Sequence, residues 1–124
     1  MQKQKSLSVY SWTREYVEEI RSNLKKIWGF SPTNPQIIEY SITHIGKLTG
    51  GNPIPMDYIR QVSRLLKGKK SFHVTISMDK FIELNRLSKE VQMCGMTTIF
   101  TLSIILFVTA QSLRRIVLFD NNVD

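Results

Sequence analysis

Cysteine and histidine are scarce, with only Cys94, His44 and His73 among the 124 residues. A single cysteine cannot form an internal disulfide, and these three side chains do not make the four-ligand set of a structural zinc site. Acids, bases and nucleophiles do not recur at the spacing of an active site either. The sequence therefore predicts no catalytic residues, no metal and no cofactor, and we do not expect an enzyme.

Two further signals are missing from the sequence. Residues 68–71, Gly-Lys-Lys-Ser, are similar to the end of a phosphate-binding loop. The first glycine of that motif is missing, however, and the strand pattern follows these residues instead of preceding them. Residues 1–8 are polar and basic and lack the apolar stretch of a secretory signal. We therefore expect a cytoplasmic protein without a nucleotide site.

The charge of the chain is strongly positive and unevenly placed. Lysine and arginine number 17 against 10 acids, which gives a net charge of +7. Residues 1–70 carry 12 basic and 5 acidic side chains, whereas residues 71–124 carry 5 of each. This localised excess favours a polyanionic partner, either nucleic acid or anionic lipid.

Two short segments alternate polar and apolar residues, which is typical of a strand with one solvated face. They are Ser6–Tyr10 and Ser71–Ile76, and their first residues lie 65 positions apart. Each segment runs directly into a helical pattern, with Ser11 and Ser77 as candidate N-caps. We expect the apolar side chains of both strands to face the core: Leu7, Val9, Phe72, Val74 and Ile76.

Helical periodicity and helix breakers place five helices around these strands. Thr33 or Asn34 is expected to cap the second helix, with Pro35 at its first position. The prediction is a mainly α protein with one two-stranded antiparallel β-ribbon, in which aromatic residues such as Trp12, Tyr16, Trp28 and Phe30 lie in the core. The expected helices span residues 12–27, 36–48, 57–67, 81–91 and 98–118.

The strand-to-helix junctions carry a resemblance to a known family. Residues 7–10, Leu-Ser-Val-Tyr, lead into residues 12–15, Trp-Thr-Arg-Glu, and residues 74–79, Val-Thr-Ile-Ser-Met-Asp, form the second junction. Together with the element order, which covers about three quarters of the chain, they resemble the ribbon-helix-helix (MetJ/Arc-like) family of DNA-binding transcription regulators. Tandem copies are similar to conjugative-plasmid regulators and to regulators of archaeal viruses, and the latter would place the protein in the host cytoplasm.

The resemblance implies two ribbon-helix-helix units within one chain, arranged as a pseudo-symmetric dimer. Residues 1–48 would form the first unit, 49–69 a linker with a connecting helix, 70–119 the second unit, and 120–124 a tail. A two-helix unit with one strand cannot bury its apolar face alone, so the two units would share a core. Their paired strands would form a ribbon of the size that enters the DNA major groove.

The resemblance also implies two sets of DNA-contacting residues. The outward face of the ribbon would meet the bases, and the starts of the second helices, together with lysines that flank the strands, would bind phosphates. The base-facing set is Ser6, Ser8, Tyr10, Ser71, His73 and Thr75. The phosphate-binding set is Lys3, Lys5, Thr33, Asn34, Lys69, Lys70, Thr97 and Thr98.

This ribbon departs from the family in its base-reading residues. Readers in the family are often Arg, Lys, Asn or Gln, whereas here they are mainly hydroxyls. We therefore expect weak direct readout, supported by Tyr10, His73, water bridges and DNA shape. The turn glycines, Gly29 and Gly95, are also shifted from the usual spacing, which leaves the starts of both second helices open.

The segment from Val91 to Leu113 contains no charged residue and is about 20 residues long, enough to cross a bilayer. One alternative is therefore a small membrane-anchored protein with a basic cytoplasmic interaction domain. The other is a helix buried on several sides, whose surplus apolar face, Phe100, Ile104 and Val108, would drive self-association. The ribbon-helix-helix fold would also suit an antitoxin or a conjugation accessory protein.

Overall fold

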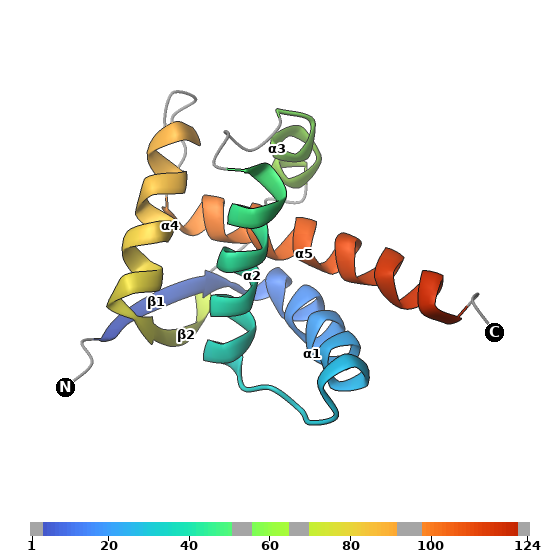
Figure 1. Cartoon of the computed structure of the whole chain (residues 1–124). Coiled ribbons are helices and arrows are strands. Elements are labelled where there is room, and N and C mark those ends of the chain that lie inside the picture. The colour runs from blue at the N-terminus through green and yellow to red at the C-terminus, as the bar shows by residue number, and fades with distance from the viewer. Residues whose placement is uncertain (1–3, 51–55, 65–69, 92–97, 122–124) are drawn as a thin grey trace.

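The computed structural model describes residues 4–50, 56–64, 70–91 and 98–121, and all statements below refer to these residues. The fold is mainly helical with one two-stranded antiparallel sheet, as predicted (Figure 1). Strand β1 (Gln4–Tyr10) leads through a short 3-10 turn (Ser11–Thr13) into α1 (Arg14–Trp28), α2 (Asn34–Thr49) and α3 (Met56–Ser63). Strand β2 (Lys70–Ser77) is followed by α4 (Met78–Val91) and α5 (Thr98–Asn121).

The two strands pair with each other although most of the chain's first half separates them. Ser6 lies opposite Thr75 and Leu7 lies opposite Val74 in an antiparallel register. The expected inward residues Leu7, Val9, Val74 and Ile76 are buried, which confirms the predicted period of two. The side chain of Phe72 lies outside the described part.

The predicted caps after the two strands have different outcomes. The backbone N–H of Lys80 donates to the Ser77 hydroxyl at 3.4 Å, so Ser77 does cap α4. Ser11 is not an N-cap, because residues 11–13 form a 3-10 turn and α1 begins only at Arg14. The buried Thr13 hydroxyl donates to the Tyr10 carbonyl at 2.6 Å and so holds this tight turn at the end of the strand.

Helix α2 begins with a reciprocal capping box. The Gln36 N–H donates to the Thr33 hydroxyl at 3.4 Å, and the Thr33 N–H donates to the Gln36 side-chain oxygen at 2.9 Å. Thr33 is therefore the cap, and Pro35 stands at the second helical position instead of the first. Glycines in left-handed backbone conformation, Gly29 (φ 81°) and Gly50 (φ 60°), end α1 and α2.

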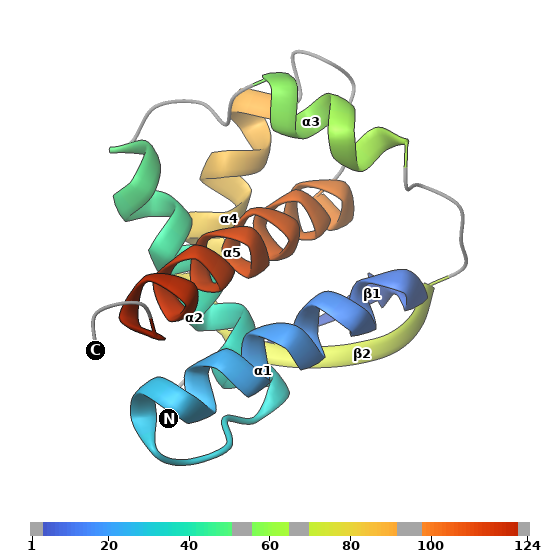
Figure 2. The same ribbon diagram turned by 90° about the vertical axis from the view of Figure 1, so that its right-hand side faces the viewer.

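Helix α5 is the central element of the fold. It contacts all four other α-helices and β1, and it lies between α3 and the ribbon in both views (Figures 1 and 2). Ile104 and Val108, which were expected to face another molecule, are 0% and 4% exposed within the chain itself. That expectation is wrong because neighbouring elements of the same chain cover these turns of α5.

The composition of α5 also meets the length and hydropathy criteria of a membrane span. Its window Thr101–Leu118 has a mean hydropathy of 1.5, but 56% of this window is buried inside the protein. The core helix of a globular fold passes the same test, and the Thr109 hydroxyl is satisfied within the helix by the Ile105 carbonyl at 2.7 Å. The packing thus accounts for the apolar composition without a bilayer.

We predict that Ile105→Ala in α5 lowers the free energy of unfolding by about 2 to 5 kcal/mol, because it leaves a cavity where the side chain is fully buried. Urea denaturation measures this change. Ile82→Ala on α4, where the side chain is 59% exposed, is the control and should change stability by less than about 0.5 kcal/mol. Equal effects of the two substitutions would contradict the central position of α5.

His44 joins α2 to α5 through a hydrogen bond between its Nε2 and the Ser112 hydroxyl, at 2.9 Å. Its ring also stacks on Tyr40, with centroids 5.7 Å apart. Burial, and then the positive charge of Lys47, lower the pKa of His44 from its ordinary value of 6.5. The folded protein therefore disfavours the protonated imidazole more strongly than the unfolded chain does.

We predict that His44 makes the protein less stable in mild acid. Its contribution is complete above the unfolded pKa and is lost as the pH falls through the lowered folded pKa. The free energy of unfolding should therefore fall more steeply between about pH 7 and about pH 5 in the wild type than in His44→Gln. Other titrating groups are common to both proteins and cancel, so parallel pH profiles would show that His44 does not act in this way.

Candidate nucleic-acid interface

The outward face of the ribbon is polar and solvent-exposed. Ser6, His73 and Thr75 are exposed, whereas Leu7, Val9, Val74 and Ile76, which alternate with the outward residues, are buried. Ser6 and Thr75 are direct cross-strand partners, and the backbone of Ser8 pairs with that of His73. Three members of the predicted base-facing set thus share one face. The side chains of Ser8 and Ser71 lie outside the described part.

The ribbon is irregular at its Tyr10 end. Tyr10 is half-buried, and its ring stacks on Trp12 with centroids 6.1 Å apart and an angle of 12° between the planes. The register shifts between Val9 and Tyr10, so that Tyr10 pairs with Lys70 and Ser71 is the extra residue of the irregularity. Tyr10 is therefore packed against the 3-10 turn that follows the strand as well as lying in the ribbon.

A polar hollow of about 310 Å³ adjoins the ribbon. It is lined by Arg14, Val17, Glu18, Asn34 and His73. This hollow brings His73, predicted to face bases, beside Asn34, predicted to bind phosphate. Arg14, the first residue of α1, is exposed and lines the same hollow.

Arg21 ties the start of α2 to α1. Its Nε donates to the Pro32 carbonyl at 3.0 Å, and its guanidinium also bonds the carboxylate of Glu18 and the side-chain oxygen of Asn34. These bonds fix the loop that precedes α2. They also mean that the Asn34 side-chain oxygen has a partner within the fold.

Thr33 remains chemically suited to an anion despite its capping role. Its hydroxyl oxygen accepts a bond from Gln36, but a hydroxyl has one O–H donor in addition to its acceptor sites. Thr33 is exposed, so that donor is accessible at the positive end of the helix dipole. The equivalent start of α5 includes Thr98, of which only the backbone is described, and Thr97, which lies outside the described residues.

Among the flanking lysines, the structure describes the side chain of Lys5. Lys5 is exposed, and its ammonium lies 5.4 Å from the centroid of the Phe81 ring in a cation-π contact. Lys70 contributes only its backbone to the described part, and Lys3 and Lys69 lie outside it. Of the predicted phosphate set, the structure thus places the side chains of Lys5, Thr33 and Asn34.

Neither Arg14 nor Arg21 is among the candidate contacts of this site that the sequence predicts. The spacing of Arg14 just after the strand was the only available signal. No spacing rule links Arg21 to Pro32 and Asn34, because that contact forms only when the loop folds back on α1.

A scan of family models, curated proteins and solved structures finds no match to this chain.

We predict that Arg21→Ala lowers the free energy of unfolding by roughly 1 to 3 kcal/mol, because charge-assisted bonds between α1 and the start of α2 are lost. Thermal and urea unfolding measure the change. Lys25→Ala, at an exposed position of the same helix, is the matched control. A cost no greater than that of Lys25→Ala would mean that Arg21 does not hold the loop.

Proposed function

We propose that this chain binds duplex DNA sequence-selectively by inserting the β1–β2 ribbon into the major groove, and that it acts as a transcription regulator of the tandem ribbon-helix-helix type. The observation that carries the proposal is the pairing of β1 with β2, with Ser6, His73 and Thr75 exposed on one face. A two-stranded ribbon fits the width of the major groove, where each base pair presents a distinct set of donors and acceptors.

The charge distribution supports the same partner. The whole net charge of +7 resides in residues 1–70, which include Lys5, Arg14 and the start of α2. Basic groups beside an outward polar ribbon are suited to the phosphates that flank a groove. Hydroxyls and one imidazole offer little bidentate readout, so the proposed selectivity relies in part on DNA shape and bridging water.

The order of the strands and helices supports the proposal of two ribbon-helix-helix units. Strand, helix and helix occur twice, in β1–α1–α2 and β2–α4–α5, and residues of both halves share one hydrophobic core. Helix α3 precedes β2, at the place of the proposed linker. In this proposal the two halves are two ribbon-helix-helix units joined in one chain.

Self-association through α5 and attachment to a membrane both stay predictions. Among the side chains of α5 that the structure describes, the large apolar ones that are exposed are Ile116 and Leu118, which favours the end of this helix for any self-association. The extensive burial of α5 weakens the argument for a membrane anchor. Recovery of the expressed protein only with detergent would restore that alternative.

The test of DNA binding begins with selection of preferred sites from a pool of random duplexes. Binding of the selected duplex is then compared with that of a scrambled duplex at two salt concentrations. We expect the ribbon variant Ser6→Ala, His73→Ala, Thr75→Ala to lose about tenfold or more of its site preference, because three single hydrogen bonds of about 0.5 to 1.5 kcal/mol each are removed together. It should retain most of its binding to the scrambled duplex.

Two control variants separate readout from charge. Gln61→Ala, at an exposed position of α3 away from the ribbon, should leave both affinities unchanged. Lys5→Ala should weaken binding to both duplexes alike and reduce the salt slope by about 1. A ribbon variant that keeps its full site preference would refute the proposed readout, and no binding of the wild type to any duplex would refute DNA binding altogether.

A further inference from the structure

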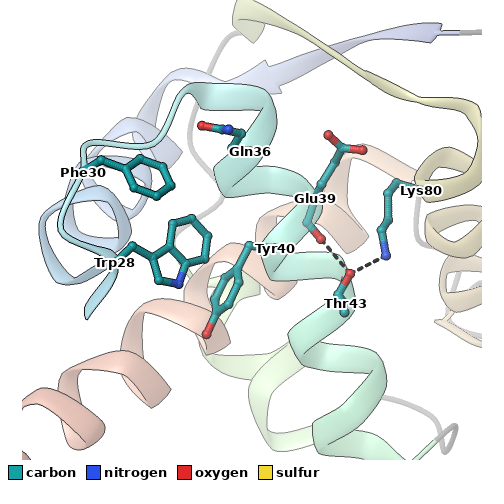
Figure 3. Close-up of a pocket in the computed structure, with 7 residues that line it drawn as sticks. All are labelled: Trp28, Phe30, Gln36, Glu39, Tyr40, Thr43 and Lys80. Atoms are coloured by element: carbon teal, nitrogen blue, oxygen red, sulfur yellow. Dashed lines mark hydrogen bonds between the residues drawn. The ribbon is translucent and has the colours of Figure 1, made fainter. Parts of the chain in front are cut away.

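A second hollow is lined mainly by residues of α2 and by none of the outward residues of the ribbon. We call it the aromatic hollow, and its volume is about 690 Å³. Three aromatic rings stand on one side of it, and the Lys80 ammonium lies across from them (Figure 3). Its lining residues are Trp28, Phe30, Gln36, Glu39, Tyr40, Thr43 and Lys80.

Two of the aromatic side chains are unusually open to solvent for their size. Trp28 is 37% exposed and Phe30 is 51% exposed, so the expectation that both belong to the core is wrong. Trp28 is the last residue of α1, and Phe30 follows Gly29, which ends the helix in a left-handed conformation. Large aromatic rings gathered at one exposed place are typical of binding surfaces.

The rings form a corner instead of a flat patch. Trp28 and Phe30 are stacked, with centroids 5.5 Å apart and planes 29° apart. Tyr40 meets Trp28 nearly edge-on, with centroids 5.4 Å apart and planes 83° apart. A planar ring can therefore stack on one wall while its edge contacts the other, which are the two favoured geometries of aromatic pairs.

Hydrogen-bond donors predominate on the polar side of the hollow. The Lys80 ammonium bonds the Thr43 hydroxyl and lies 3.4 Å from a Glu83 carboxylate oxygen, and its side chain is 28% exposed. The Gln36 side-chain oxygen accepts a bond from the Thr33 N–H, and the amide group also offers two N–H donors at the hollow.

The single acid of the lining is engaged elsewhere. An oxygen of Glu39 accepts a hydrogen bond from the Ser77 hydroxyl at 2.6 Å, at the junction of β2 and α4. That bond holds the carboxylate toward Ser77, and Figure 3 shows it pointing away from the Lys80 ammonium. Thr43 and Glu83 occupy two of the three N–H donors of Lys80, which leaves one donor for an acceptor that carries negative charge.

We infer that the aromatic hollow binds a small planar aromatic carboxylate, with its ring in the corner of Trp28, Phe30 and Tyr40 and its carboxylate at Lys80. The volume lies within the range of about 300 to 1,000 Å³ that is usual for small-molecule sites. A charge-assisted bond to an ammonium gives the orientation, and the rings give the apolar contact. This inference does not depend on DNA binding.

The experiment compares two probes that share one ring and differ in charge. Binding of 1-naphthoate and of 1-naphthylmethylamine to the full chain is measured by isothermal titration calorimetry at neutral pH, without DNA. We expect 1-naphthoate to bind measurably and at least about tenfold more tightly than the amine, as one charge-assisted contact of about 1.4 kcal/mol predicts.

Three variants locate the binding site. Lys80→Gln should weaken 1-naphthoate about tenfold and abolish the preference over the amine, whereas Phe30→Ala should weaken both probes. Phe30 is half exposed, so its removal leaves the core intact, and circular dichroism checks this for each variant. Ile82→Ala removes another exposed apolar side chain, outside the hollow, and should leave binding unchanged.

Several outcomes overturn the inference. No binding of 1-naphthoate to the folded wild type does so, and so does equal or tighter binding of the amine. Full affinity in both Lys80→Gln and Phe30→Ala places the ligand elsewhere. Equal losses in Ile82→Ala and Phe30→Ala indicate adhesion to any apolar surface. None of these results bears on the duplex-binding assay, so the two proposals fail independently.

Discussion

The antiparallel pairing of β1 with β2 is the contact on which the rest of the fold depends. An isolated two-stranded ribbon is at best marginally stable, so it must be backed by an apolar layer. Here Leu7, Val9, Val74 and Ile76 supply one side of that layer, and α5 packs directly against β1. The pairing joins segments about 65 residues apart and thereby commits both halves of the chain to one core.

Helix α5 completes that core, which explains its composition. A helix surrounded by protein needs apolar side chains on all sides, so it lacks the polar stripe of a surface helix. By composition alone such a segment is equivalent to a membrane span. A core helix differs from a membrane span because other parts of the protein cover its side chains. Here elements of the same chain cover Leu102, Ile105 and Leu106.

The strands and their buried faces could be predicted from the sequence, because a period of two assigns each side chain to one face of a ribbon. Helix identities and the Thr33 and Ser77 caps also followed from local patterns. Tertiary contacts could not be predicted in the same way. The burial of Ile104 and Val108 depends on elements far away in sequence, such as α1 and α2, which pack against α5.

The candidate site, too, could be predicted from the sequence only in part. The shared outward face of Ser6, His73 and Thr75 is a consequence of strand alternation and was foreseeable. The meeting of His73 with Asn34 and Arg14 in one hollow requires the loop before α2 to fold back on α1. Exposure of Trp28 and Phe30 was unforeseeable for a similar reason, since aromatic residues at helical spacing are more often buried than gathered in an open corner.

Amide chemical-shift mapping of the labelled protein during titration with a short mixed-sequence duplex tests the central claim most directly. If the ribbon is the DNA-binding element, the largest changes fall on residues 4–8 and 73–77, with smaller ones at Thr33 and Asn34. Large changes confined to α3 or to the end of α5, with the strand signals unmoved, would contradict the account.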